Sequence, residues 1–81
     1  MQTVMIYDTK DFYFSALLLT NNFKLVQSQE GIGGVHFFFL NNNEELLKKL
    51  ENDFEKCIAT VPMKKFTSSL ARLRRELDQY K

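Results

Sequence analysis

The sequence predicts an α+β protein, a two-layer sandwich in which a three-stranded, mostly antiparallel sheet carries three helices on one face. Apolar residues recur first at strand spacing and then at helix spacing, in the order β-α-β-β-α-α. Three glycines among residues 31–34 indicate a hairpin between the second and third strands. We expect residues 1–81 to form a single domain.

The first strand is expected at Thr3 to Tyr7, where side chains alternate between two faces. Asp8 or Thr9 then suits the cap of a helix that begins near Lys10, and Asn21-Asn22 suits its end. The segment 11–20 is apolar on nearly every side. Such a helix is expected to be buried on more than one side or to form part of an interface.

The second and third strands are expected at Phe23 to Ser28 and Val35 to Leu40, joined by a loop of about 5 residues. The third strand is apolar on both faces, because Phe37 and Phe39 alternate with His36 and Phe38. This pattern predicts a central strand, or a strand whose second face meets a partner.

The second helix is expected to begin at the cap residue Asn43 and to bury one stripe of apolar side chains. That predicted stripe consists of Leu46, Leu47, Leu50, Phe54, Cys57 and Ile58. Pro62 suits the first turn of a third helix that continues to Tyr80. The apolar stripe of this third helix consists of Phe66, Leu70, Leu73 and Leu77.

Four cations gather on the opposite side of the third helix, namely Lys64, Lys65, Arg72 and Arg75. Residues 59–81 hold six cations against two acids, a net charge of +4, whereas residues 1–58 carry −3. This asymmetry is typical of an end that binds a polyanion. We therefore expect a non-enzymatic protein that binds DNA or RNA weakly through phosphate contacts. The alternative for the cations alone is a solvated helix face.

A second hypothesis is a protein-interaction adaptor or inhibitor that docks through an apolar helix and strand surface. The residues expected at such an interface are Phe14, Leu18, His36 and Phe38. The partner would be a second copy of the chain or a larger protein. Phe38 and His36 also suit a platform on which unpaired bases stack.

No residue pattern predicts a cofactor, a metal site or a catalytic group, so an enzyme is the least favoured class. Cys57 and His36 are the only residues of their types, too few for a closed zinc site. Asp8 and Asp11 are spaced to bind a divalent cation, although helix capping explains both. We expect no membrane span and no secretory signal, and a lone cysteine favours a reducing, cytoplasmic setting.

The chain resembles a family of small bacterial and phage domains of unknown function. The likeness covers the opening Tyr7-Asp8-Thr9-Lys10-Asp11-Phe12, then Ala16-Leu17-Leu18-Leu19 before Phe23-Lys24-Leu25, the Phe37-Phe38-Phe39 strand, Phe54, and Val61-Pro62 with Phe66, Leu70 and Leu73. Asn21-Asn22 departs from the turn common in such domains. The resemblance implies a phage or mobile-element setting and no activity, cofactor or catalytic residue.

Overall fold

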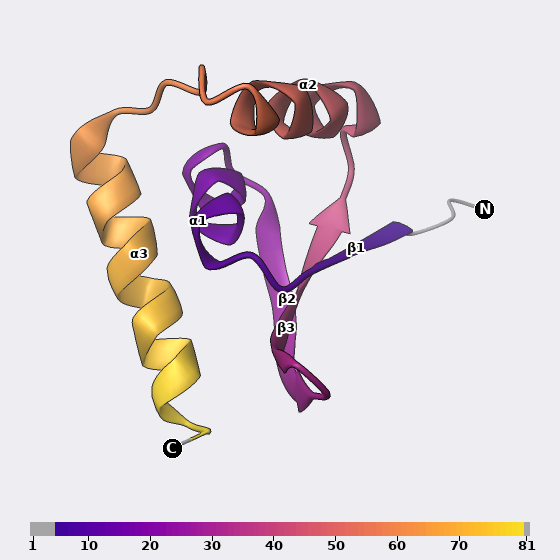
Figure 1. Cartoon of the computed structure of the whole chain (residues 1–81), viewed down its shortest axis with the longest axis vertical. Coiled ribbons are helices and arrows are strands. Elements are labelled where there is room, and N and C mark those ends of the chain that lie inside the picture. The colour runs from indigo at the N-terminus through magenta and orange to yellow at the C-terminus, as the bar shows by residue number, and fades with distance from the viewer. Residues whose placement is uncertain (1–4, 81) are drawn as a thin grey trace.

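A computed structural model describes residues 5–80, and the predicted order of strands and helices is confirmed (Figure 1). The strands form one antiparallel sheet in the order β1-β3-β2. The part of the first predicted strand at Thr3 and Val4 lies outside the described residues. The elements are β1 (Met5–Thr9), α1 (Phe12–Thr20), β2 (Lys24–Gly31), β3 (Gly34–Asn41), α2 (Glu44–Glu55) and α3 (Met63–Asp78).

The third strand is central, as its two apolar faces predicted. On the face toward the helices, Phe39 lies between Tyr7 of β1 and Leu25 of β2, and Phe37 is equally buried. We call this the inner face of the sheet. The opposite, outer face carries His36 and the other alternate side chains of β3.

The hairpin turn between β2 and β3 is shorter than expected. The prediction of about 5 loop residues was wrong, because pairing continues to Gly31 and Gly34 and leaves only Ile32 and Gly33 between them. Gly33 and Gly34 have φ of 86° and 130°, a region that only glycine adopts readily, so this sequence permits the tight turn. A register shift between Leu25 and Gln27 marks a bulge and explains the imperfect alternation of β2.

Helix α1 lies between the sheet and α3, with α2 packed against it as well (Figure 1). The Asp11 carboxylate caps the helix by accepting from the Phe14 N–H at 2.9 Å. Every residue from Phe14 to Leu18 is buried, and the Ser15 hydroxyl satisfies its hydrogen bond by donating to the Asp11 carbonyl at 2.7 Å. The expected burial on more than one side is therefore confirmed.

Helix α2 ends earlier than predicted, at Glu55. Cys57 has φ of 58°, and the N–H groups of Cys57 and Ile58 donate back to Phe54 and Asp53 at 3.1 and 2.9 Å. This bonding pattern closes a helix with a left-handed residue. The prediction that Cys57 and Ile58 belong to the buried stripe was wrong, and both are exposed.

Helix α3 packs mainly against α1, and the predicted apolar stripe of its side chains is confirmed. Leu73 is 0% exposed, while Phe66, Leu70 and Leu77 are partly buried against the core. Near its end, Glu76 accepts a hydrogen bond from Ser28 of β2 at 2.9 Å, which ties α3 to the sheet. Within residues 5–80, no helix has both the length and the apolar composition that crossing a membrane requires.

The contact between α3 and α1 makes a testable contribution to stability. Leu73→Ala should lower the free energy of unfolding by about 2–5 kcal/mol, because it leaves a cavity in a fully buried site. Met63→Ala, on the same helix but at a residue 81% exposed, should change it by less than about 0.5 kcal/mol. Chemical denaturation measures both, and equal effects of the two substitutions would contradict this packing.

Candidate nucleic-acid interface

The four predicted cations are all exposed on the side of α3 that faces away from its buried stripe. Lys64, Lys65, Arg72 and Arg75 form no ion pair with any residue among 5–80. The ion pairs found there instead join His36 to Asp8 and Lys48 to Glu44. The charge of these four side chains is thus not neutralised by carboxylates of the described chain.

The start of α3 adds to this positive potential. Pro62 offers no side-chain cap, and the first turn contains Lys64 and Lys65 but no acid. The N-terminal end of a helix carries a partial positive charge, so two lysines there add to the positive potential. This potential attracts an approaching anion. Helix α2 has the opposite arrangement, with Glu44 and Glu45 in its first turn.

Two shallow hollows separate the basic side of α3 from the turn between α1 and β2. Lys64 and Lys65 line the first, Arg72 lines the second, and Asn22 and Ser68 line both. Their volumes are ≈ 400 and ≈ 320 Å³. Polar groups of a backbone, such as phosphate and sugar oxygens, would meet cations, hydroxyls and an amide there.

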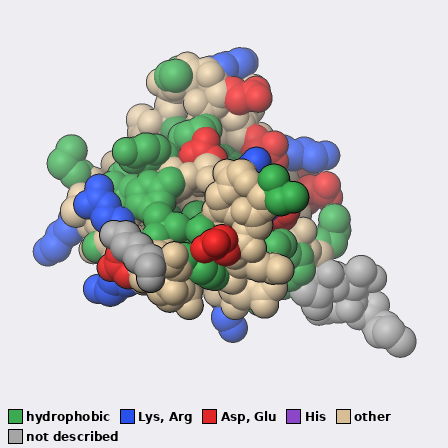
Figure 2. Space-filling model, turned by 60° about the horizontal axis from the view of Figure 1, so that its bottom comes forward, with side chains coloured by type: hydrophobic (Ala, Val, Ile, Leu, Met, Phe, Trp, Pro, Cys, Tyr) green, Lys and Arg blue, Asp and Glu red, His purple; other side chains and the backbone are tan. Residues whose placement is uncertain are grey.

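The basic side chains lie along one edge of the molecule. In Figure 2 several Lys and Arg side chains lie at the left, beside a patch of hydrophobic side chains and with an acidic side chain among them. Most Asp and Glu side chains in this view lie to the right of that patch. The charge asymmetry predicted from the sequence is therefore present in space.

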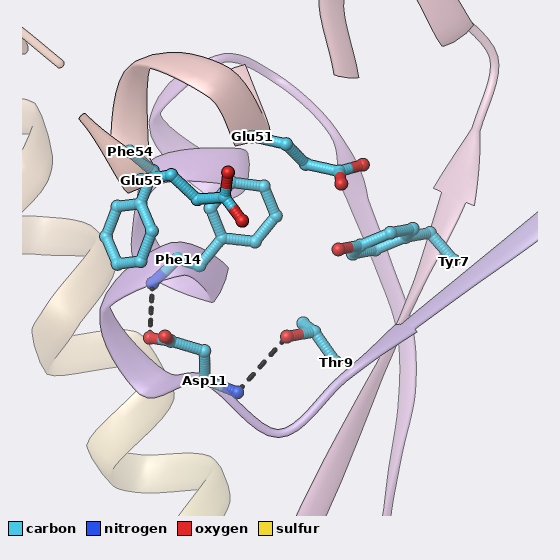
Figure 3. Close-up of a pocket in the computed structure, with 7 residues that line it drawn as sticks. All are labelled: Tyr7, Thr9, Asp11, Phe14, Glu51, Phe54 and Glu55. Atoms are coloured by element: carbon cyan, nitrogen blue, oxygen red, sulfur yellow. Dashed lines mark hydrogen bonds between the residues drawn. The ribbon is translucent and has the colours of Figure 1, made fainter. Parts of the chain in front are cut away.

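An acidic hollow of ≈ 250 Å³ lies between β1, the start of α1 and the end of α2 (Figure 3). The Tyr7 hydroxyl and the carboxylate of Glu51 both point into it, and Asp11 and Glu55 lie at its rim. Burial raises the pKa of Tyr7, and the nearby Glu51, Asp11 and Asp8 raise it further. Phosphates would be repelled from this surface, which excludes it from a nucleic-acid interface.

Asp8 and Asp11, which the sequence offered as a pair of ligands for a divalent cation, have different partners in the structure. Asp11 caps α1, whereas Asp8 lies on the outer face of the sheet, with its Oδ1 2.9 Å from Nδ1 of His36. Among residues 5–80, no cluster of three or more His, Cys, Asp or Glu side chains is arranged to hold a metal ion.

The four residues predicted for a protein interface fall into two groups. His36 and Phe38 lie on the outer face and are partly exposed. Phe14 and Leu18 are 4% and 0% exposed within the chain's own core, so they offer no surface to a partner. Their apolar character is explained by packing of α1, and only His36 and Phe38 remain candidates.

An apolar hollow of ≈ 450 Å³ lies between α1 and the segment that joins α2 to α3. Sequence reasoning missed this hollow because it placed Cys57 inside a helix, and the only signal in the sequence was the helix break at Thr60-Val61-Pro62. Ile58 in the connecting segment is also exposed. The hollow is lined by Tyr13, Leu17, Phe54, Cys57, Ala59, Val61 and Phe66.

The chain matches no family model, no curated protein and no solved structure. The resemblance to small bacterial and phage domains stays an expectation, and the function must be argued from the geometry above.

The raised pKa of Tyr7 predicts a loss of stability in alkaline solution. The folded chain holds the Tyr7 proton more tightly than the unfolded chain, whose tyrosines ionise near pH 10. Stability is therefore fully retained below about pH 10 and falls as the pH rises through the pKa of the folded state. Tyr7→Phe should remove this part of the alkaline loss. Denaturation curves at neutral pH and above pH 10 measure it, and identical pH profiles would contradict the assignment.

Proposed function

We propose that this chain is a non-enzymatic nucleic-acid-binding protein whose contact surface is the basic side of α3. Lys64, Lys65, Arg72 and Arg75 would contact phosphates of DNA or RNA. The proposal is supported above all by the exposure of these four cations without a carboxylate partner among residues 5–80. The only carboxylates of α3 are Glu76 and Asp78, in its last turn, so its first three turns present cations without acids.

The strength of binding follows from the number of phosphates neutralised. Four contacts give a slope of about −2.8 for the logarithm of affinity against the logarithm of salt concentration on single strands, and about −3.6 on duplex DNA. Such binding is weak at physiological salt. A dimer that bound as one unit would double the slope, because it would neutralise twice as many phosphates.

The setting belongs to the proposal as well. We infer an accessory protein of a phage or mobile element, acting in the cytoplasm beside a larger partner or as a homodimer. The lone Cys57 supports a reducing compartment.

Replacing two of the arginines tests the interface. Arg72→Gln with Arg75→Gln should weaken binding to a labelled oligonucleotide and lower the salt slope to about half, because two of four counterion-releasing contacts are lost. Fluorescence anisotropy across a salt series measures both quantities.

The matched control removes the same charge from another helix region. Lys49→Gln with Lys56→Gln alters two exposed cations of α2 and its C-terminal cap, neither of them in an ion pair with a described residue. This variant should keep the slope of the unaltered chain. If the two double variants behaved alike, binding would depend on net charge only and α3 would not be the interface.

The apolar hollow beside α1 favours a second candidate function, a protein-interaction adaptor or inhibitor. Tyr13 is 56% exposed at its rim, and exposed aromatic side chains at the edge of a hollow are common anchors of interfaces.

Tyr13→Asp separates this candidate from the first. In this test each variant is immobilised and exposed to host proteins. If the chain is an adaptor, the unaltered chain and the Arg72→Gln, Arg75→Gln variant should both retain the same host protein, and the Tyr13→Asp variant should not retain it. Retention that depends on the arginines and not on Tyr13, or that nuclease treatment abolishes, would exclude the adaptor role.

A further inference from the structure

The outer face of the sheet is not covered by the helices, which pack on the inner face. Its central row belongs to β3, and Phe38 is flanked by Asp8 of β1 and Gln27 of β2. Toward one end, Leu40 lies between Ile6 and Lys24, and Ile6 is 49% exposed. The middle of the outer face therefore consists of aromatic and aliphatic side chains, and polar side chains of β1 and β2 lie on both sides of Phe38.

Two aromatic rings lie side by side on this face. The rings of His36 and Phe38 are within 21° of parallel, with centroids 6.3 Å apart. The Asp8 carboxylate oxygen Oδ1 accepts a hydrogen bond from the Nδ1–H of His36 at 2.9 Å, and this bond fixes the His36 ring. The two rings are therefore nearly parallel, and 29% of the His36 side chain remains exposed.

The spacing of the rings suits an extended single strand. Bases in a stacked helix rise by about 3.4 Å per nucleotide. Rings 6.3 Å apart can each hold one base only if neighbouring bases are unstacked from one another. Base stacking on aromatic side chains tolerates any sequence, because every base has a flat face.

Lysines lie at the two ends of this face, and two carboxylates lie between them. Lys24 stands at one end of the face, and the Lys10 amine lies beside Gly33 at the hairpin turn, at the other end. Between them lies a hollow of ≈ 250 Å³, which is lined by Asp8, Gln29, Glu30, Gly31, His36 and Phe38. Carboxylate and amide groups can bond the edges of bases, while the terminal lysines attract phosphates.

The size of the face argues against a second copy of the chain. Three strands about 4.8 Å apart, with about 3.3 Å per residue along each, present roughly 300 Å². A stable interface needs about 800 Å² from each partner. The face is therefore wide enough for two or three bases, and a stable dimer would have to bury further surface outside the sheet.

We propose that the outer face of the sheet binds unpaired bases of single-stranded nucleic acid, with Phe38 and His36 as the rings on which two neighbouring bases stack. This site lies on the other side of the sheet from α3, so it does not depend on the phosphate contacts proposed for that helix.

The test compares two probes, a labelled oligothymidylate and an abasic deoxyribose-phosphate strand of the same length. Phe38→Leu should weaken binding of the oligothymidylate by about tenfold, within a range of roughly 5- to 150-fold for one lost stack, and should not alter binding of the abasic strand. Phe38→Tyr keeps a ring and should bind both probes like the unaltered chain. Ile6→Ala removes apolar surface from the same face without touching a ring, and it should change neither affinity by more than about twofold.

The outcomes distinguish this site from the interface on α3. Binding of the oligothymidylate without binding of the abasic strand would support the sheet site and count against α3. Equal binding of both probes, or equal effects of Phe38→Leu on both, would overturn the sheet site and leave α3 standing. A chain that light scattering finds dimeric, and that Phe38→Leu makes monomeric, would assign the face to a second copy and also overturn the proposal.

Discussion

The burial of α1 on two sides is the constraint on which the rest of the structure depends. Its residues from Phe14 to Leu18 contact the inner face of the sheet on one side and α3 on the other. A three-stranded sheet with one short helix would bury too little apolar area for a chain of this size. Helix α3 supplies the missing layer by packing Leu73 and its neighbours against α1.

This packing also decides where the charges lie. Once the apolar stripe of α3 faces α1, helical geometry turns Lys64, Arg72 and Arg75 toward solvent. The carboxylates of Asp11, Glu51 and Glu55 line the hollow around Tyr7 instead. The same arrangement that completes the core therefore separates a basic edge from an acidic one, and the proposed phosphate contacts follow from that separation.

Periodicity in the sequence was sufficient to predict the order of elements along the chain and the buried stripe of α3, because each depends on local spacing, and it predicted a central β3 as one of two alternatives. It could not predict the end of α2, since the left-handed conformation of Cys57 occupies a position where glycine is the usual signal. The sequence also could not predict the pairing of Asp8 with His36, because that pairing depends on which strands are neighbours and on their register. Phe14 and Leu18 looked like interface residues because spacing cannot tell an internal partner layer from an external one.

The most direct test of the central claim is an NMR titration of the isotope-labelled full chain with a short single-stranded oligonucleotide at low salt. If α3 presents its cations to phosphates, the amide signals from Lys64 to Arg75 should shift, and those around Tyr7 and Glu51 in the acidic hollow should not. Raising the salt concentration should reverse the shifts on α3. Unchanged α3 signals at saturating oligonucleotide, or shifts confined to the apolar hollow near Tyr13, would contradict the account.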